Sequence, residues 1–213
     1  MSVEQADRRS EMGPELHAVV EVDLRPEGSW VALPREPWPR FVRLAGSATD
    51  SDIALLVGVA SSYGRTDQRA AESARALLAD FPHVLPGGIA VVAPERSIFP
   101  GCCCGLEGWP DWRHVLETGA GPWTGHDPAP LVEVVGDEVR VWSDGGLSAR
   151  PQDEQPLTFA RSEFVEALDR VSADLEEFLP RLRRWLDIHA PLYAKRLVER
   201  FADRFVRPKR RRR

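Results

Sequence analysis

The segment Leu131–Trp142, LVEVVGDEVRVW, is the stretch that determines the predicted fold. It consists of two apolar runs, 131–135 and 138–142, with the dipeptide Gly136-Asp137 between them. Two such runs joined by a two-residue turn are a strong sequence signal for a β-hairpin. The chain is therefore expected to contain antiparallel β-structure, and the other segments are interpreted around this hairpin.

Further strands of the same sheet are predicted on the N-terminal side of the hairpin. Within residues 16–24, the aliphatic side chains Val20, Val22 and Leu24 alternate with Glu21 and Asp23, which is the pattern of a half-buried strand. The runs 53–60, IALLVGVA, and 89–93 are apolar on both faces, as is typical of central strands that are covered on both sides. Short pairing segments are expected at 30–33 and 41–44, on either side of a proline-rich stretch.

Helices are predicted to begin near residues 66, 110, 162 and 191. After Ser162, apolar side chains recur every three or four residues as far as Trp185, which predicts a long amphipathic helix. Pro180 falls inside this stripe and predicts a kink or a break, because proline removes a helix hydrogen bond. The predicted fold class is α+β: a single mixed or antiparallel sheet built from the segments at 16, 53, 89, 131 and 138, covered by helices and followed by a C-terminal helical extension.

Length and composition favour one main domain with polar ends. The 213 residues are 43% hydrophobic and 29% charged, which is the balance of a globular chain. We expect a disordered lead-in at 1–14, an α+β body at 15–156, C-terminal helices at 157–206 that pack on the body, and a disordered basic tail at 207–213. The longest apolar run is far shorter than the roughly 20 residues that span a bilayer, and no secretory signal opens the chain. A cytoplasmic location and no membrane partner are therefore predicted.

The net charge of −5 divides unequally between the body and the tail. The last seven residues, RPKRRRR, hold six basic side chains, and without them 22 basic residues face 33 acidic ones, a charge of −11. An acidic body favours a basic protein as its partner and disfavours nucleic acid. Only weak contacts with polyanions are expected from the tail, through Lys209, Arg210, Arg211, Arg212 and Arg213.

All three cysteines lie side by side in one irregular segment, Ile98–Trp123, IFPGCCCGLEGWPDWRHVLETGAGPW. An odd number of adjacent cysteines argues against disulfides, since bridges stabilise a chain by closing long loops. We therefore expect free thiols. Cysteine is among the most buried residue types, so the favoured interpretation of Cys102, Cys103 and Cys104 is the packing of small hydrophobic side chains.

The same segment leaves two chemical alternatives open. A thiol near a glycine-rich turn could act as a nucleophile with His114 or His126 as its base, and His126 with Asp127 could form a catalytic dyad. A zinc ion could take the cysteines with these side chains as further ligands, but zinc usually takes cysteines that are two to four residues apart. The spacing therefore favours a protein without a metal or a cofactor. The candidate catalytic residues are Cys102, Cys103, Cys104, His114, His126 and Asp127.

Three tryptophans of this segment suggest a binding surface. Trp109 and Trp112 are three residues apart, which places them on one face of a short helix that begins at Pro110. Tryptophan supplies a large contact area with few rotatable bonds and is common at the centre of interfaces. The predicted surface comprises Trp109, Trp112, Trp123, His126 and Asp127. The alternative is that these rings cover the core beneath an irregular loop.

A family resemblance can be added to this interpretation. A strand that ends in IFPGCCCGLEGW, a hairpin, and a helix that begins LTFARSEFVEAL follow one another between Ile89 and Leu168. This order resembles the SUKH superfamily of bacterial immunity proteins, with Phe159, Glu163 and Phe164 at the matching positions. The N-terminal helix of that family is not found in this chain, and the last two helices have no counterpart in it. The chain equally resembles an actinobacterial family of its own kind.

The resemblance implies an α+β fold and a cytoplasmic protein that neutralises a toxin by contact, without catalysis. The leading hypothesis is accordingly a non-catalytic protein-binding module, an immunity protein whose acidic body suits a basic toxin. The alternatives are an enzyme that uses a cysteine or the His126–Asp127 pair, and a zinc-binding protein.

Overall fold

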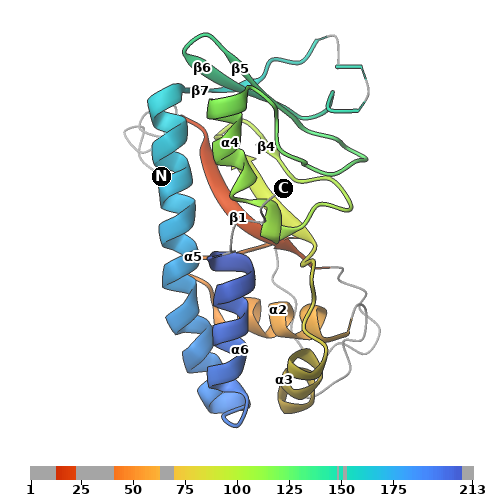
Figure 1. Ribbon diagram of the computed structural model, residues 1–213, viewed down its shortest axis with the longest axis vertical. Helices are drawn as coiled ribbons and strands as arrows, with labels where there is room; N and C mark the ends of the chain where they lie inside the picture. Colours follow the sequence, from red (N-terminus) through yellow and green to blue (C-terminus); the bar gives the residue numbers. More distant parts are fainter. Residues whose placement is uncertain (1–12, 23–40, 63–69, 148, 151–152, 208–213) are drawn as a thin grey trace. The chain divides into compact units, whose positions relative to one another are not determined.

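The computed structural model describes residues 13–22, 41–62, 70–147, 149–150 and 153–207 (Figure 1). Within these residues the chain forms five α-helices and two antiparallel sheets, one of four strands and one of three. The predicted α+β class is confirmed, but two sheets are present instead of the single sheet that the sequence predicts. The expected strand at 30–33, the lead-in up to residue 12 and the tail from residue 208 lie outside the described residues.

The first sheet has the strand order β2-β1-β3-β4. Its strands are β1 (Glu15–Glu21), β2 (Phe41–Arg43), β3 (Gly87–Val92) and β4 (Ser97–Ile98). Val20 of β1 pairs with Val42, and Val91 of β3 pairs with Ile98. The strands predicted around residues 16, 41 and 89 are thus confirmed.

The second sheet confirms the predicted hairpin and extends it by one strand. It consists of β5 (Leu131–Val135), β6 (Glu138–Trp142) and β7 (Leu157–Ala160), in that order. Gly136 has a φ of 62°, which is the left-handed conformation that such a turn requires. Strand β7 occupies LTFA, which the family resemblance assigns to the beginning of the following helix, whereas the helix begins at Arg161, close to the start that the apolar periodicity predicts. Ala160 N donates to Glu163 Oε2 (2.9 Å), and this contact marks where the strand ends and the helix begins.

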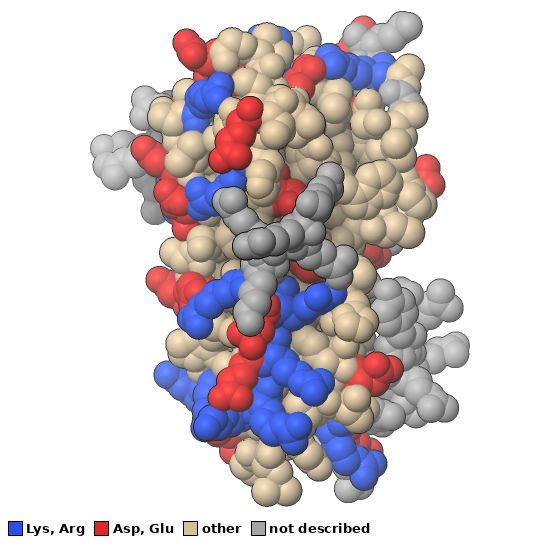
Figure 2. Space-filling model, in the orientation of Figure 1, with Lys and Arg blue, Asp and Glu red and all other residues tan. Residues whose placement is uncertain are grey.

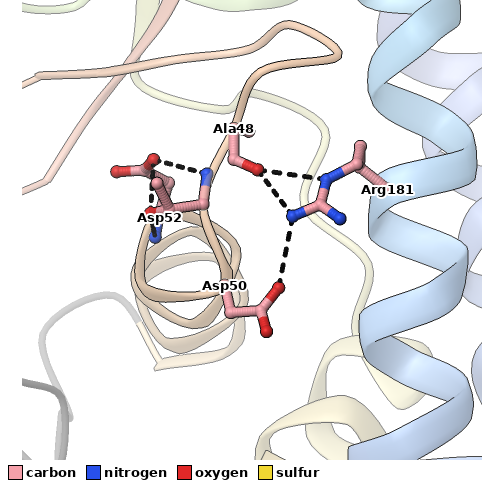
Figure 3. A network of polar contacts seen from close by, with 5 residues as sticks. Ala48, Asp50, Asp52 and Arg181 are labelled. Atoms are coloured by element: carbon pink, nitrogen blue, oxygen red, sulfur yellow. Dashed lines mark hydrogen bonds and ion pairs between the residues drawn. The ribbon is translucent and has the colours of Figure 1, made fainter.

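The run IALLVGVA is a helix, so the prediction of a central strand at 53–60 is wrong. It belongs to α2 (Asp50–Ser62). Thr49 and Asp52 form a capping box at its start: Thr49 N and Thr49 Oγ1 donate to Asp52 Oδ2 (2.8 and 2.7 Å), and Asp52 N donates to Thr49 Oγ1 (3.2 Å; Figure 3). An apolar run without a polar face fits a buried helix as well as a buried strand, and here the cap decides between them.

A second contact holds the start of α2 against the long helix α5 (Arg161–His189). Arg181 donates from Nε and Nη2 to Ala48 O (3.2 and 3.0 Å) and lies 3.3 Å from Asp50 Oδ1 (Figure 3). A charged donor on a carbonyl beside the helix start satisfies that acceptor without burying the charge. The next helix in the chain, α3 (Ala70–Ala79), corresponds to the helix predicted to begin near residue 66.

Helix α5 continues through Pro180, so the predicted break is absent. The proline is exposed, while its neighbours Phe178 and Leu182 are buried at 0% and 3% exposure and hold the helix on both sides of it. Proline has no N–H to donate to the carbonyl four residues earlier. Because Pro180 lies on the solvent side of the helix, water can satisfy that carbonyl. Helix α6 (Ala194–Phe201) and a π-helical turn, η2 (Ala202–Val206), complete the chain as described.

The chain divides into two compact units, and β1 and α5 each run from one into the other. The first unit contains Met1–Ala18 and Gly87–Val171. The second contains Val19–Pro86 and Ser172–Arg213.

Each unit has its own apolar core. In the first, the ring of Phe159 on β7 packs edge-on against Phe164 on α5, with 5.5 Å between the centroids. In the second, Phe178 on α5 lies 5.7 Å from Phe201 on α6, which lies 5.1 Å from Phe205. Among the described helices, none is long and apolar enough to cross a membrane.

Candidate functional site

Two loop segments of the first unit lie side by side and bring the candidate residues together. Gly101 N donates to Thr124 O and Cys102 N donates to His126 O, both at 2.8 Å, and His126 N donates to Cys102 O at 3.0 Å. These bonds form an isolated antiparallel bridge between Cys102 and His126. Two residues that are 24 positions apart in the chain thereby become neighbours.

Glycines make this close approach of the two backbones possible. A Cβ atom at Gly101 would collide with the carbonyl oxygen of Pro128 and would lie 2.7 Å from that of His126. Gly125 has a φ of 95°, and a Cβ atom there would lie 2.5 Å from Gly101 O and 2.6 Å from Cys102 O. Every one of these obstacles is backbone, which cannot move aside as a side chain can. The bridge therefore requires glycine at both positions.

Left-handed residues then turn the side chains toward one another. Cys103 has a φ of 61° and Asp127 a φ of 54°, and both are residues other than glycine. Such a conformation costs about 1–2 kcal/mol per residue. It also changes the direction of the Cys103 side chain relative to Cys102. The two sulfur atoms and a ring nitrogen of His126 lie within 4.8 Å of one another as a result.

The imidazole of His126 is in contact with both a thiol and a carboxylate. Cys102 Sγ lies 2.9 Å from Nδ1 and 3.7 Å from Nε2. Asp127 Oδ2 lies 3.0 Å from the same Nδ1. The sulfur and the carboxylate thus face one ring nitrogen, and Nε2 is the nitrogen that the carboxylate leaves free.

The three cysteines occupy three different environments. Cys104 is buried, Cys102 is half-buried and Cys103 is exposed. The interpretation of the cysteines as packing residues is therefore confirmed for Cys104 and wrong for Cys103. Burial, reinforced by the negative charge of Glu107, raises the pKa of the Cys104 thiol to about 12, although a hydrogen bond from the backbone of Gly105 opposes this. Cys104 is thus an unreactive thiol, whereas its two neighbours are accessible.

The tryptophans divide in the same way. Trp109 and Trp112 are only 6% and 4% exposed, and Trp112 stacks on Phe164 with 6.3 Å between the centroids. These two rings therefore belong to the core, as in the alternative interpretation of the sequence. Trp123 is 53% exposed, donates from Nε1 to Cys103 O (3.2 Å), and presents its edge to the ring of His126. Of the three, Trp123 alone borders the thiols.

His114 has a different position from His126. It lies on α4 (Asp111–Thr118), with its Nδ1 3.8 Å from Asp111 Oδ1. The structure thus brings together Cys102, Cys103, His126 and Asp127 from the predicted candidates. It gives Cys104 and His114 other surroundings. The glycines that flank the bridge, Gly101 before Cys102 and Gly125 before His126, were the signal in the sequence that backbones can pass closely here.

Comparisons with protein families, with curated proteins and with solved structures find no match to this chain. The SUKH resemblance therefore stays a prediction.

Proposed function

We propose that the protein binds a thiophilic metal ion, Zn²⁺, through Cys102, Cys103 and His126, here named the Cys-Cys-His site. The observation that carries this proposal is the convergence of three ligand atoms within 4.8 Å. Thiolate and imidazole are the ligands that zinc prefers. Adjacent cysteines rarely point the same way, and the left-handed conformation of Cys103 supplies the unusual backbone that allows it.

The distances suit a tetrahedral ion. Zinc binds sulfur at about 2.3 Å and nitrogen at about 2.0 Å, so two ligand atoms around it lie roughly 3.5–3.8 Å apart. Cys102 Sγ is 3.7 Å from His126 Nε2, which is within this range. With one ring nitrogen of His126 counted, the two sulfur atoms and that nitrogen all lie within 4.8 Å of one another, and side-chain rotation would bring them to the distances of a bound ion.

Asp127 acts in this proposal as a positioning residue. Its Oδ2 lies 3.0 Å from Nδ1 of His126, so it can accept the proton of that nitrogen. Zinc-binding histidines commonly donate their second ring N–H to a carboxylate, which fixes the tautomer and the ring orientation. With Nε2 as the ligand atom, Nδ1 would keep its N–H for the carboxylate of Asp127.

The ligand set leaves one coordination position open. Three protein ligands plus water are typical of zinc sites that exchange ligands or polarise a substrate, whereas structural sites have four. Two thiolates also balance the charge of the ion. Cys103 is exposed, so the open position is accessible from solvent. The site is therefore suited to an ion that accepts a further ligand.

A cysteine nucleophile is a poorer fit to this geometry. In a thiol–imidazole–carboxylate triad, the nucleophile contacts one ring nitrogen and the carboxylate contacts the other. Here Cys102 Sγ and Asp127 Oδ2 both face Nδ1 of His126, at 2.9 and 3.0 Å. A carboxylate placed there competes with the thiol and does not orient the base toward it.

Calorimetric titration of the reduced protein with Zn²⁺ tests the proposal. We expect one ion per chain, and a loss of affinity of more than about 100-fold in Cys102→Ser and in His126→Ala, since each removes a ligand. Asp127→Asn keeps the ligands and should weaken binding about 10–100-fold. Cys104→Ala and His114→Ala are the matched controls and should bind as the wild type does. Equal losses in the controls, or a wild type that binds no zinc, would contradict the proposal.

The exposure of Trp123 favours protein binding as a second candidate function. Its ring is 53% exposed and is held by the bond from Nε1 to Cys103 O, so it offers a fixed apolar face. The chain without its last seven residues has a charge of −11, which suits a basic partner such as a toxin. A pull-down with the wild type and with Trp123→Ala, followed by a binding assay with any basic protein that the wild type recovers, tests it. Trp123→Ala should weaken that complex without lowering the melting temperature. Equal binding of the partner by the wild type and by Trp123→Ala would contradict this role.

A further inference from the structure

The turn between α5 and α6 combines basic side chains with exposed aliphatic side chains. Residues 181–196 contain five basic side chains, namely Arg181, Arg183, Arg184, Lys195 and Arg196, against a single acidic one, Asp187. Figure 2 shows Lys and Arg side chains gathered over the part of this face where α5 and α6 lie, with uncharged residues beyond them at the turn. All of these residues belong to the second unit.

Two large aliphatic side chains project from the same turn. Leu192 is 87% exposed and Ile188 is 68% exposed, the highest values among the large hydrophobic side chains of the described residues. Arg184 and Ile188 are four residues apart on α5, so they share one helix face. These two exposed aliphatic side chains, four positions apart in the chain, are here named the apolar tip.

Several of the surrounding cations are available for an external partner. Arg183 is held by Asp187 (2.8 Å), and Lys195 has only a long contact with Glu199 (3.9 Å). The ion pairs found within the described residues involve neither Arg184 nor Arg196. Both side chains are exposed, Arg184 on α5 four residues before Ile188 and Arg196 on α6 four residues after Leu192.

We propose that this turn binds the surface of a membrane that contains anionic lipids. Ile188 and Leu192 enter the boundary between headgroups and acyl chains, and Arg184, Lys195 and Arg196 contact the lipid phosphates. An apolar tip ringed by basic residues is the composition of segments that lie in that interface. Nucleic acid shares the phosphate chemistry, but sites for single strands use aromatic rings for stacking, whereas the most exposed apolar side chains of this turn are aliphatic.

Vesicle flotation with the full-length protein tests this proposal. We expect binding to vesicles of phosphatidylcholine with phosphatidylglycerol, little binding to phosphatidylcholine alone, and weaker binding as salt is raised. Leu192→Ser should weaken binding at least about tenfold, because it removes the apolar contact. Arg184→Gln with Arg196→Gln should weaken it about 25-fold, at about fivefold per charge. The basic tail is unchanged in these variants, so the loss reports on the turn itself.

Leu147→Ser is the matched control, since Leu147 is 65% exposed but belongs to the first unit. It should bind vesicles as the wild type does. Circular dichroism melting curves should be unchanged in all variants, because the substituted side chains are exposed. Equal binding of Leu192→Ser and the wild type would overturn the proposal. So would binding to a single-stranded oligonucleotide that is insensitive to Leu192→Ser and occurs without binding to vesicles.

Discussion

The paired loops around Cys102 and the helices α5 and α6 are held together in opposite ways. The loops depend on a few backbone contacts with no free space, as at Gly101, where a Cβ atom would meet the oxygen of Pro128. The helices depend on a long row of buried side chains, each of which contributes a part of the free energy of unfolding. A small change should therefore abolish the arrangement of the loops, whereas the helices should lose stability gradually and keep their form.

The largest expected effect is the loss of a buried ring in the helices. Phe178→Ala removes a side chain with 0% exposure that contacts Phe201, and it should lower the free energy of unfolding by about 3–5 kcal/mol. Urea unfolding measures this loss. Below the unfolding transition, zinc affinity should equal that of the wild type, since the loops retain their contacts. A variant that unfolds no more easily, or that loses zinc binding while folded, would show that the two regions are not held as described.

Gly101→Ala should have the next largest effect, by adding a single methyl group. Because the added carbon collides with backbone, we expect a loss of about 3 kcal/mol together with the loss of zinc binding. Gly108→Ala is the matched control in the same unit, since a Cβ atom there meets nothing within 4 Å. Urea unfolding and zinc titration of both variants check the prediction. Wild-type zinc affinity in Gly101→Ala would break the contrast between loops and helices.

Gly58→Ala applies the same substitution to a helix. Gly58 lies inside α2, and a Cβ atom there meets nothing within 4 Å. Alanine favours a helix interior over glycine by about 1 kcal/mol, so this variant should be more stable than the wild type. Thermal unfolding measures the gain. Destabilisation would mean that helix α2 tolerates an added methyl group no better than the loops do.

The smallest effect is expected at a surface ion pair. Arg207 donates to Glu176 at 2.6 Å, and this bond lowers the pKa of the Glu176 carboxyl and raises that of Arg207. A carboxyl group with a lowered pKa stabilises the folded protein when the pH is above the pKa of that group in the unfolded chain. This stabilisation is lost as the pH falls through the lowered pKa. Arg207→Gln should therefore be slightly less stable at neutral pH and equal to the wild type in acid. Unfolding curves at both pH values measure this, and a difference that persists in acid would argue against the pair.

The sequence predicted the elements that rest on periodicity or on a tight turn. The hairpin around Gly136 and the stripe from Phe164 to Trp185 are both present in the structure. The run at 53–60 misled because an apolar run has no period that separates a buried strand from a buried helix. Its cap, Thr49 with Asp52, was the deciding signal and is visible in the sequence.

The candidate site could be predicted only in part. The sequence indicated Cys102, Cys103, His126 and Asp127, but its spacing argument assumed that adjacent side chains point apart. That assumption holds for extended or helical backbone and fails at Cys103, whose φ is 61°. Left-handed conformations of residues other than glycine are imposed by tertiary contacts, here the bridge between Cys102 and His126, and the spacing of residues does not reveal them.

The Cys-Cys-His site is tested most directly by X-ray absorption spectroscopy at the zinc edge of the zinc-loaded protein. We expect two sulfur atoms at about 2.3 Å and one nitrogen at about 2.0 Å, with a light atom of solvent as the fourth ligand. The outer-shell scattering of the imidazole ring of His126 should disappear from the spectrum of His126→Ala measured at saturating zinc, while the sulfur contribution remains. A coordination shell made only of oxygen and nitrogen, or a spectrum that is identical in His126→Ala, would contradict the proposed site.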